Sequence, residues 1–286
     1  MARDARGFAP IRDAESARYA IDRFGRFPKL LSWLVLHSAE LPTLSGVIVS
    51  RWDLDVARGV EEFASALDSN RLLMRSDSSA ESGHSPRGGY LIALAQLEAE
   101  VRPLLEQGRI VFLLEPSSPF DDLYSMSLQP DLDWQEWQLD VVGSGFDASD
   151  LKRGDVTPHE QVRAHLGRNG VMVLERVVAQ DDVFRASRAI RLEKAARMLG
   201  CSPEDAPTEL RELGETMLLD IQTYRPIPDE ALIDTIDDAM GLRQELVSRR
   251  LDDRHVAISA SLLGYAGRRV FWDIVWPRSK YRIGDE

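Results

Sequence analysis

The sequence of 286 residues contains one cysteine, Cys201, and no long apolar run. A single cysteine excludes an internal disulfide framework and any cysteine-rich metal site, and it fits a reducing compartment. No stretch approaches the roughly 18 uncharged apolar residues that a membrane-spanning helix requires. We therefore expect a cytoplasmic protein without a membrane partner.

Basic residues are also scarce, with 35 lysines and arginines against 47 aspartates and glutamates, for a formal net charge of −12. Such a chain as a whole repels a nucleic-acid backbone, so we expect no nucleic-acid partner, although a local basic pocket remains compatible with it. The first residues, MARDARGFAPIRDAES, are charged rather than apolar. We therefore expect no signal peptide.

Apolar residues make up 44% of the chain, enough to bury a sizeable core in one large domain or two smaller ones. The first third alternates between the two periodicities: helices are expected near 29–38, 57–67 and 91–107, and strands near 47–50, 72–74 and 109–114. Residues 180–250 are helical in bulk, and two strands flank a glycine turn at 264–267. The expected fold class is α/β (α+β), with a helical insert at about 180–250 before a C-terminal β-hairpin.

Arg75 stands at the end of an apolar strand and opens the segment MRSDSSAESGHSPRGGY, residues 74–90. A glycine-bearing loop after a strand can wrap anionic oxygens, because backbone N–H groups point inward and no Cβ blocks their approach. The arginine adds a planar fork of donors that suits phosphate. The spacing matches neither the Rossmann nor the P-loop motif. The residues alone leave open a phosphate site or a surface arginine.

The order of these segments resembles the nucleotide-binding domain shared by phosphoenolpyruvate synthase, pyruvate phosphate dikinase, rifampicin phosphotransferase and glucan water dikinase. The family's "VRSSATAEDLPDASFAGQ" is similar to the Arg75 segment: Arg75 and Glu81 keep their six-residue separation, Gly88 falls on the family's loop glycine, and the loop is two residues shorter. The stretch FGRFPKLLSWLVLHSAELPTLSGVIVS places Lys29 where the family keeps an ATP-contacting lysine.

Two weaker similarities follow in the same order. The segment GSGFDASDLKRGDVTPHE, residues 143–160, resembles the family's "GLGE" and "G-x-V-x-P-D" elements. The later segments PIPDEALIDTIDDAMG, HVAISAS and VFWDIVWP resemble the family's last helix and closing hairpin. The resemblance thus covers roughly residues 24–277, and the Arg75 segment is its most specific part.

What the resemblance implies is an ATP-grasp fold that holds ATP and Mg²⁺ between two lobes, residues 1–107 and residues 108–286. It implies catalytic and phosphate-binding roles for Lys29 and Arg75. It further implies a nucleotide site completed by Glu81, by the lid glycines Gly88 and Gly89, and by Glu115 beside the adenine, with Asp273 as the metal ligand.

The closing hairpin departs from the family, which places a carboxylate on the first strand and a glutamine on the second. This chain has Ala257 to Ser259 and Ile274 to Trp276 at those places, which leaves Asp273 as the acid of the second strand. Mg²⁺ is usually held by one or two carboxylates plus phosphates. Asp273 therefore either binds a cation or pairs with an arginine such as Arg268 or Arg278.

Each remaining candidate also has a structural interpretation. Lys29 fits a solvated lysine at a helix start, since most lysines are exposed. Glu81 fits a loop acid that organises the lid, and Glu115 fits a strand-end acid before a proline.

We expect a standalone ATP-grasp enzyme that binds Mg-ATP and transfers a phosphoryl group to a small-molecule acceptor or a separate carrier protein. One alternative is an ATP-dependent carboxylate–amine ligase. Another is a degenerate domain that binds nucleotide or a protein partner without catalysis. The sequence identifies neither the acceptor nor the oligomeric state.

Overall fold

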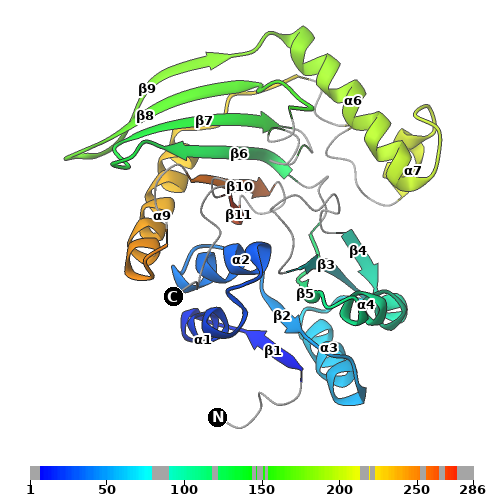
Figure 1. Cartoon of the computed structure of the whole chain (residues 1–286). Coiled ribbons are helices and arrows are strands. Elements are labelled where there is room, and N and C mark those ends of the chain that lie inside the picture. Colours follow the sequence, from blue (N-terminus) through cyan, green and yellow to red (C-terminus); the bar gives the residue numbers. More distant parts are fainter. Residues whose placement is uncertain are drawn as a thin grey trace. The chain divides into compact units, whose positions relative to one another are not determined.

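The computed structural model describes residues 7–78, 90–117, 122–143, 146, 151, 154–212, 219, 223–251, 256–263 and 268–275. The chain forms two compact units, residues 1–117 with 276–286, and residues 118–275. Each unit has its own antiparallel sheet, and helices accompany both (Figure 1). The expected α/β class is confirmed.

The first unit contains a five-stranded sheet in the order β1-β2-β5-β3-β4. Its strands are β1 (Phe8–Ile11), β2 (Gly46–Val49), β3 (Arg71–Asp77), β4 (Tyr90–Ala93) and β5 (Ile110–Leu114). Its helices are α1 (Ala14–Phe24), α2 (Pro28–Ser38), α3 (Leu54–Ala66) and α4 (Leu97–Glu106), the last preceded by the short 3₁₀ helix η2 (Leu94–Gln96).

Successive residues of β3 point to opposite faces of this sheet. Leu72 and Met74 pack in a buried cluster with Val56 of α3 and Val101 of α4. Asp77 has the opposite parity and faces α2, whose first backbone N–H groups it binds. The sheet therefore lies between two helical layers, α1 and α2 on one side and α3 and α4 on the other (Figure 1).

Two expectations for this unit need correction. The helix expected over residues 91–107 begins only at Leu97, because Tyr90–Ala93 pairs with β3 as a strand. The strand β5 pairs with both β2 and β3 and so belongs to the first sheet. The structure therefore divides the chain after Ser117, later than the division expected at residue 107.

The second unit contains a six-stranded sheet in the order β11-β10-β6-β7-β8-β9. The strands are β6 (Asp122–Pro130), β7 (Glu136–Gly143), β8 (Glu160–Gly167), β9 (Gly170–Val178), β10 (Ala257–Leu263) and β11 (Arg268–Val275). Between β9 and β10 lie α6 (Asp181–Leu199), α7 (Ala206–Glu212) and α9 (Asp229–Ser248). The helical insert and the closing hairpin are confirmed.

One face of the second sheet is apolar. Tyr124, Met126 and Leu128 of β6 alternate with serines, and β10 opposes them with Leu262, Ala260 and Ile258. Helix α9 buries its own apolar stripe, which consists of Leu232, Ile236, Ala239, Leu242 and Leu246. Arg269 of β11 shares the apolar face and forms ion pairs with two acids of α9, Asp234 and Asp238. These ion pairs tie α9 to the sheet.

Glu160, the first residue of β8, is fully buried and holds the segment that leads into α9. Its Oε2 accepts hydrogen bonds from the Tyr224 hydroxyl at 2.5 Å and from the Ile227 N–H at 3.0 Å. Its Oε1 lies 3.1 Å from Nε of Arg176. A buried carboxylate is tolerated because it is paired and hydrogen-bonded.

His159, beside Glu160, is buried within an aromatic cluster. Its Nδ1 accepts a hydrogen bond from the Gly143 N–H at 3.2 Å. Its ring centroid lies 4.9 to 5.4 Å from three aromatic rings, those of Phe146, Phe184 and Tyr224. Burial lowers the pKa of His159 to about 4.

No helix in the ranges given above is long and apolar enough to cross a membrane.

We expect the unfolding free energy to fall as the pH drops from about 6.5 to about 4, because the folded state keeps His159 neutral while the unfolded chain takes up a proton. The full effect is on the order of 3 kcal/mol. His159→Phe should remove this part of the slope, and His165→Phe, a half-buried position on β8, serves as the control. Urea unfolding at several pH values measures it. An unchanged slope in His159→Phe would contradict the expectation.

Candidate functional site

The N-terminus of helix α2 is capped by Asp77, a residue of strand β3. Asp77 Oδ2 accepts hydrogen bonds from the backbone N–H groups of Lys29 at 2.6 Å and Leu30 at 3.1 Å, and its Oδ1 accepts one from Ser78 at 2.9 Å. The helix has no local cap of this kind, because Phe27 occupies the N-cap position and Pro28 follows it. A carboxylate 48 residues away in sequence therefore fixes the start of α2 to β3.

This cap joins the start of α2, which carries Lys29, to the strand that carries Arg75. Arg75 precedes Asp77 by two residues on β3, so both side chains point to the α2 face. The guanidinium carbon of Arg75 lies 5.3 Å from the ring centroid of Phe112, its register partner on β5. Trp33 of α2 stacks on the same ring, with 5.7 Å between centroids. Arg75 thus points to the side of the sheet on which α2 packs, and Lys29 lies in the first turn of that helix.

The backbone at the start of α2 is not open to an anion. The N–H groups of Lys29 and Leu30 already donate to Asp77, which is 0% exposed. Burial raises the pKa of the Asp77 carboxyl, while its three backbone hydrogen bonds and the charge of Lys29 act in the opposite direction. A phosphate at this helix end would therefore have to be bound by side chains, rather than by bare N–H groups.

Glu115 follows β5 and extends the pairing of β5 with β2. Its N–H donates to the Ser45 carbonyl at 2.8 Å, and its Oε2 accepts a hydrogen bond from the Ser45 N–H at 3.0 Å. Just after Ser45, a Cβ at Gly46 would lie 2.9 Å from the Trp33 ring, so only glycine lets this ring pack against β2. The Glu115 side chain thus accepts a backbone hydrogen bond from Ser45, the residue just before β2.

Asp273, the expected metal ligand, lies in the second unit, on β11 directly opposite Ser259 of β10. Ser259 in turn opposes Ser127 of β6, and Ser127 opposes Asp140 of β7. Directly opposed residues of antiparallel strands point to the same face. We call Asp273, Ser259, Ser127 and Asp140 the polar row. At its end, the Gln161 amide donates to Asp140 Oδ1 at 2.8 Å.

Sequence reasoning missed the serines of the polar row. A signal was present, because apolar residues alternate with serines in LYSMSL on β6 and in AISASL on β10. Such alternation predicts a strand with two different faces. Only the register between the strands shows that the serines meet Asp273.

The structure brings together only part of the predicted site. Lys29 at the start of α2, Arg75 on β3 and Glu115 after β5 lie in the first unit, whereas Asp273 belongs to the second unit. Glu81, Gly88 and Gly89 lie outside the described residues.

The donor set around Asp273 fits a hard cation. Carboxylate and hydroxyl oxygens are the ligands that Mg²⁺ prefers, and Mg²⁺ usually takes one or two carboxylates together with phosphates of the substrate. Ser259 Oγ, buried opposite Asp273, has no hydrogen-bond partner among the described residues. Within those residues, no group of three or more His, Cys, Asp or Glu side chains could hold a metal ion. Phosphates would therefore have to supply the remaining ligands.

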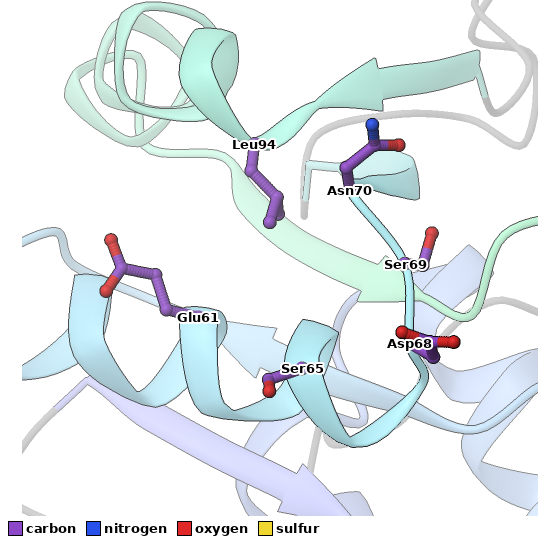
Figure 2. Close-up of a pocket in the computed structure, with 6 residues that line it drawn as sticks. All are labelled: Glu61, Ser65, Asp68, Ser69, Asn70 and Leu94. Carbon is purple, nitrogen blue, oxygen red and sulfur yellow. The ribbon is translucent and has the colours of Figure 1, made fainter.

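A cavity of about 600 Å³ in the first unit lies away from these residues. Figure 2 shows that it lies between α3 and the residues that flank β3 and β4. Its lining consists of Glu61, Ser65, Asp68, Ser69, Asn70 and Leu94. The cavity borders the start of β3, whereas Arg75 and Asp77 lie near the end of that strand. Its two acids also disfavour a phosphate ligand.

Comparison with known proteins gave solved structures only. No family model matches the sequence, and no curated protein is significantly similar. The solved structures include the ATP-grasp ligase PsnB complexed with minimal precursor, with a TM-score of 0.37, 10% identity, and coverage of 88% of this chain and 52% of that chain. Macrocyclase MdnC bound with precursor peptide MdnA from Microcystis aeruginosa MRC has a TM-score of 0.37, 8% identity, and coverage of 86% and 51%.

D-alanine–D-alanine ligase from Bacillus anthracis has a TM-score of 0.39, 8% identity, and coverage of 92% of this chain and 55% of that chain. The chain thus spans about half the length of each of these three proteins. At such low TM-scores and identities, the likeness carries no conclusion about the activity of this chain.

We expect Asp77→Ala to lower the unfolding free energy by about 1–3 kcal/mol, because it leaves the first N–H groups of α2 buried without an acceptor. Amide hydrogen exchange at Lys29 and Leu30 should accelerate. Asp53→Ala is the matched control: Asp53 caps α3 through the Val56 N–H at 3.0 Å, and its loss should cost about 1 kcal/mol without reaching α2. Equal exchange at α2 in both variants would contradict the role of Asp77.

Proposed function

We propose that this chain is an ATP-grasp-type enzyme that binds Mg-ATP and transfers its γ-phosphoryl group to an acceptor. The observation that supports the proposal is the Asp77 cap, which joins the start of α2, where Lys29 lies, to the strand β3 that carries Arg75. These are the two basic residues that the sequence resemblance assigns to the ATP phosphates. Their side chains would neutralise the charge that develops on the phosphoryl oxygens.

The first choice of acceptor is a carboxylate, which makes the protein an ATP-dependent carboxylate–amine ligase. A carboxylate is already ionised at neutral pH, so it can attack phosphorus without a general base. A hydroxyl acceptor would need a base within hydrogen-bond reach. Asp77, the carboxylate placed beside Lys29, is committed to three backbone N–H groups. Because these hydrogen bonds occupy Asp77, it is poorly placed to act as a general base. An acceptor that is already ionised, such as a carboxylate, is therefore favoured.

The proposed reaction has two balanced steps. An acceptor carboxylate oxygen bonds to the γ-phosphorus as the bond to the ADP oxygen breaks, which gives an acyl phosphate and ADP. An amine nitrogen then bonds to the acyl carbon, inorganic phosphate leaves, and the amine loses a proton to solvent. Asp273 would hold Mg²⁺, which withdraws charge from the phosphate oxygens when it is bound. Lys29 and Arg75 would orient the phosphates during the first step.

Phosphoryl transfer to a hydroxyl or to a carrier protein is the second candidate. It is favoured by the sequence resemblance, which is to the nucleotide-binding domain of dikinases and phosphotransferases. Its product would be a phosphate ester or a phosphorylated carrier rather than an acyl phosphate.

We expect Arg75→Ala to weaken Mg-ATP binding roughly 10- to 100-fold, because one or two charge-assisted hydrogen bonds to phosphate are lost. Arg71→Ala is the matched control, since Arg71 lies exposed at the start of the same strand. Calorimetric titration with ATP and Mg²⁺ measures both variants and the parent. Equal affinity in Arg75→Ala and the parent, or no binding by the parent, would reject the proposal.

Hydroxylamine trapping separates the two acceptor classes. With Mg-ATP, a pool of free amino acids and short peptides, and hydroxylamine as the amine, a ligase should release ADP and form a hydroxamate. A kinase should release ADP and leave a phosphate ester that resists hydroxylamine. If ADP release depends on the added acceptor but no hydroxamate forms, the ligase proposal is rejected in favour of phosphoryl transfer.

A further inference from the structure

Strand β9 forms one end of the second sheet, and in the described part of the chain it pairs with β8 alone (Figure 1). Its Met172, Leu174, Val177 and Val178 are 50%, 54%, 55% and 41% exposed. They make up four of the nine large apolar side chains that lie exposed among the described residues. Single exposed apolar residues are normal, whereas a row of them along one strand marks an interaction surface.

The strands at the other ends of the two sheets carry features that hinder pairing with another chain. β1 and β4 have four residues each, and β1 contains Pro10, which has no N–H to donate. β11 carries Arg268, Arg269 and Asp273, and charges along an edge strand oppose pairing. β9 is nine residues long and has no proline. It is therefore the least protected of these edges.

The two charged residues of β9 are engaged within their own chain. Glu175 lies 3.4 Å from Arg163 of β8, and Arg176 forms ion pairs with Glu160 and Asp229. With one acid and one base, β9 carries no net charge, although the chain as a whole carries −12. Two copies can therefore meet along this strand without a local excess of like charge.

A bulge in β9 makes the strand complementary to itself. The bulge falls between Val173 and Glu175, so Leu174 has no opposite residue on β8. Met172 and Val177 are an odd number of positions apart and would lie on opposite faces of a regular strand. Because of the bulge, they lie on the same face.

Directly opposed residues of an antiparallel pair point to the same face. A two-fold axis between the bulge residue and Glu175 meets this condition. It sets Met172 of each copy opposite Val177 of the other, and Val171 opposite Val178, with the two members of each pair on one face. Apolar residues thus meet apolar residues at both ends of the pairing, and each contact occurs twice, as two-fold symmetry requires.

We propose that β9 is a dimer interface, at which the β9 strands of two copies pair antiparallel in this register and join their second sheets into one continuous sheet. An open strand edge accepts another extended strand. A second copy brings a strand of the same length, with the same open edge and the matching apolar pattern. The proposal does not depend on the proposed function.

Sedimentation equilibrium over a series of protein concentrations measures the dimer. We expect the parent to dimerise, and Val177→Lys to raise the dimer dissociation constant by roughly 10-fold or more, because a lysine then lies opposite Met172 in both halves of the interface. Leu54→Lys is the matched control, since Leu54 is 88% exposed in the first unit, and it should dimerise as the parent does. Circular dichroism checks that each variant is folded.

Cross-linking tests the register. In a Cys201→Ser chain, Met172→Cys combined with Val177→Cys should form a covalent dimer under a mild oxidant. Neither cysteine alone should do so, because like positions of the two copies lie about 17 Å apart in this register and a disulfide needs Cα atoms within about 7 Å. The same separation prevents a disulfide within one strand.

Each outcome decides part of the proposal. A parent that stays monomeric at the highest concentration reached overturns it and leaves the edge of β9 to a strand of a different protein. If Val177→Lys dimerises as well as the parent, the interface lies elsewhere and the proposal is rejected. A dimer that Val177→Lys disrupts, but that the two cysteines do not cross-link, refutes the register.

Discussion

The buried carboxylate of Asp77 is the constraint on which the candidate phosphate site depends. A fully buried acid opposes folding unless hydrogen bonds compensate it, and here three backbone N–H groups do so. The start of α2 in turn needs an acceptor, because the residues before it offer no side-chain cap. The N–H groups of α2 satisfy the buried carboxylate of Asp77, and this carboxylate supplies the acceptor that the start of α2 lacks. This pairing joins the start of α2, which carries Lys29, to the strand that carries Arg75.

The second sheet shows how one strand can serve two purposes. On β10, Ile258, Ala260 and Leu262 build the apolar face, while Ser259 and Ser261 build the polar one. Because side chains alternate along a strand, a shift of one residue would exchange these faces and place serines in the apolar core. The apolar face thus fixes the register, and the register aligns the polar row. The packing of the core thereby determines which polar groups meet.

The sequence predicted the elements with strong local signals: α2, α3, β5 and the closing hairpin all lie near their expected positions. It did not predict β1, whose four residues include a proline, and it did not predict β6, β8 or β9. The phosphate-binding roles of Arg75 and Lys29 come from resemblance to a family and stay predictions. Asp77 was not found, because its partners are 48 residues away and no local pattern links them. The polar row likewise required a register that no single strand encodes.

The chemistry of the two units differs in a way that bears on the ligand. The first offers cationic side chains, Lys29 and Arg75, and its helix end is already occupied by Asp77. The second offers oxygen donors with negative charge, Asp273 and the serines beside it. A free nucleotide presents only anionic groups and would suit the first set alone. The oxygen donors of the second unit have the opposite preference and suit a cation.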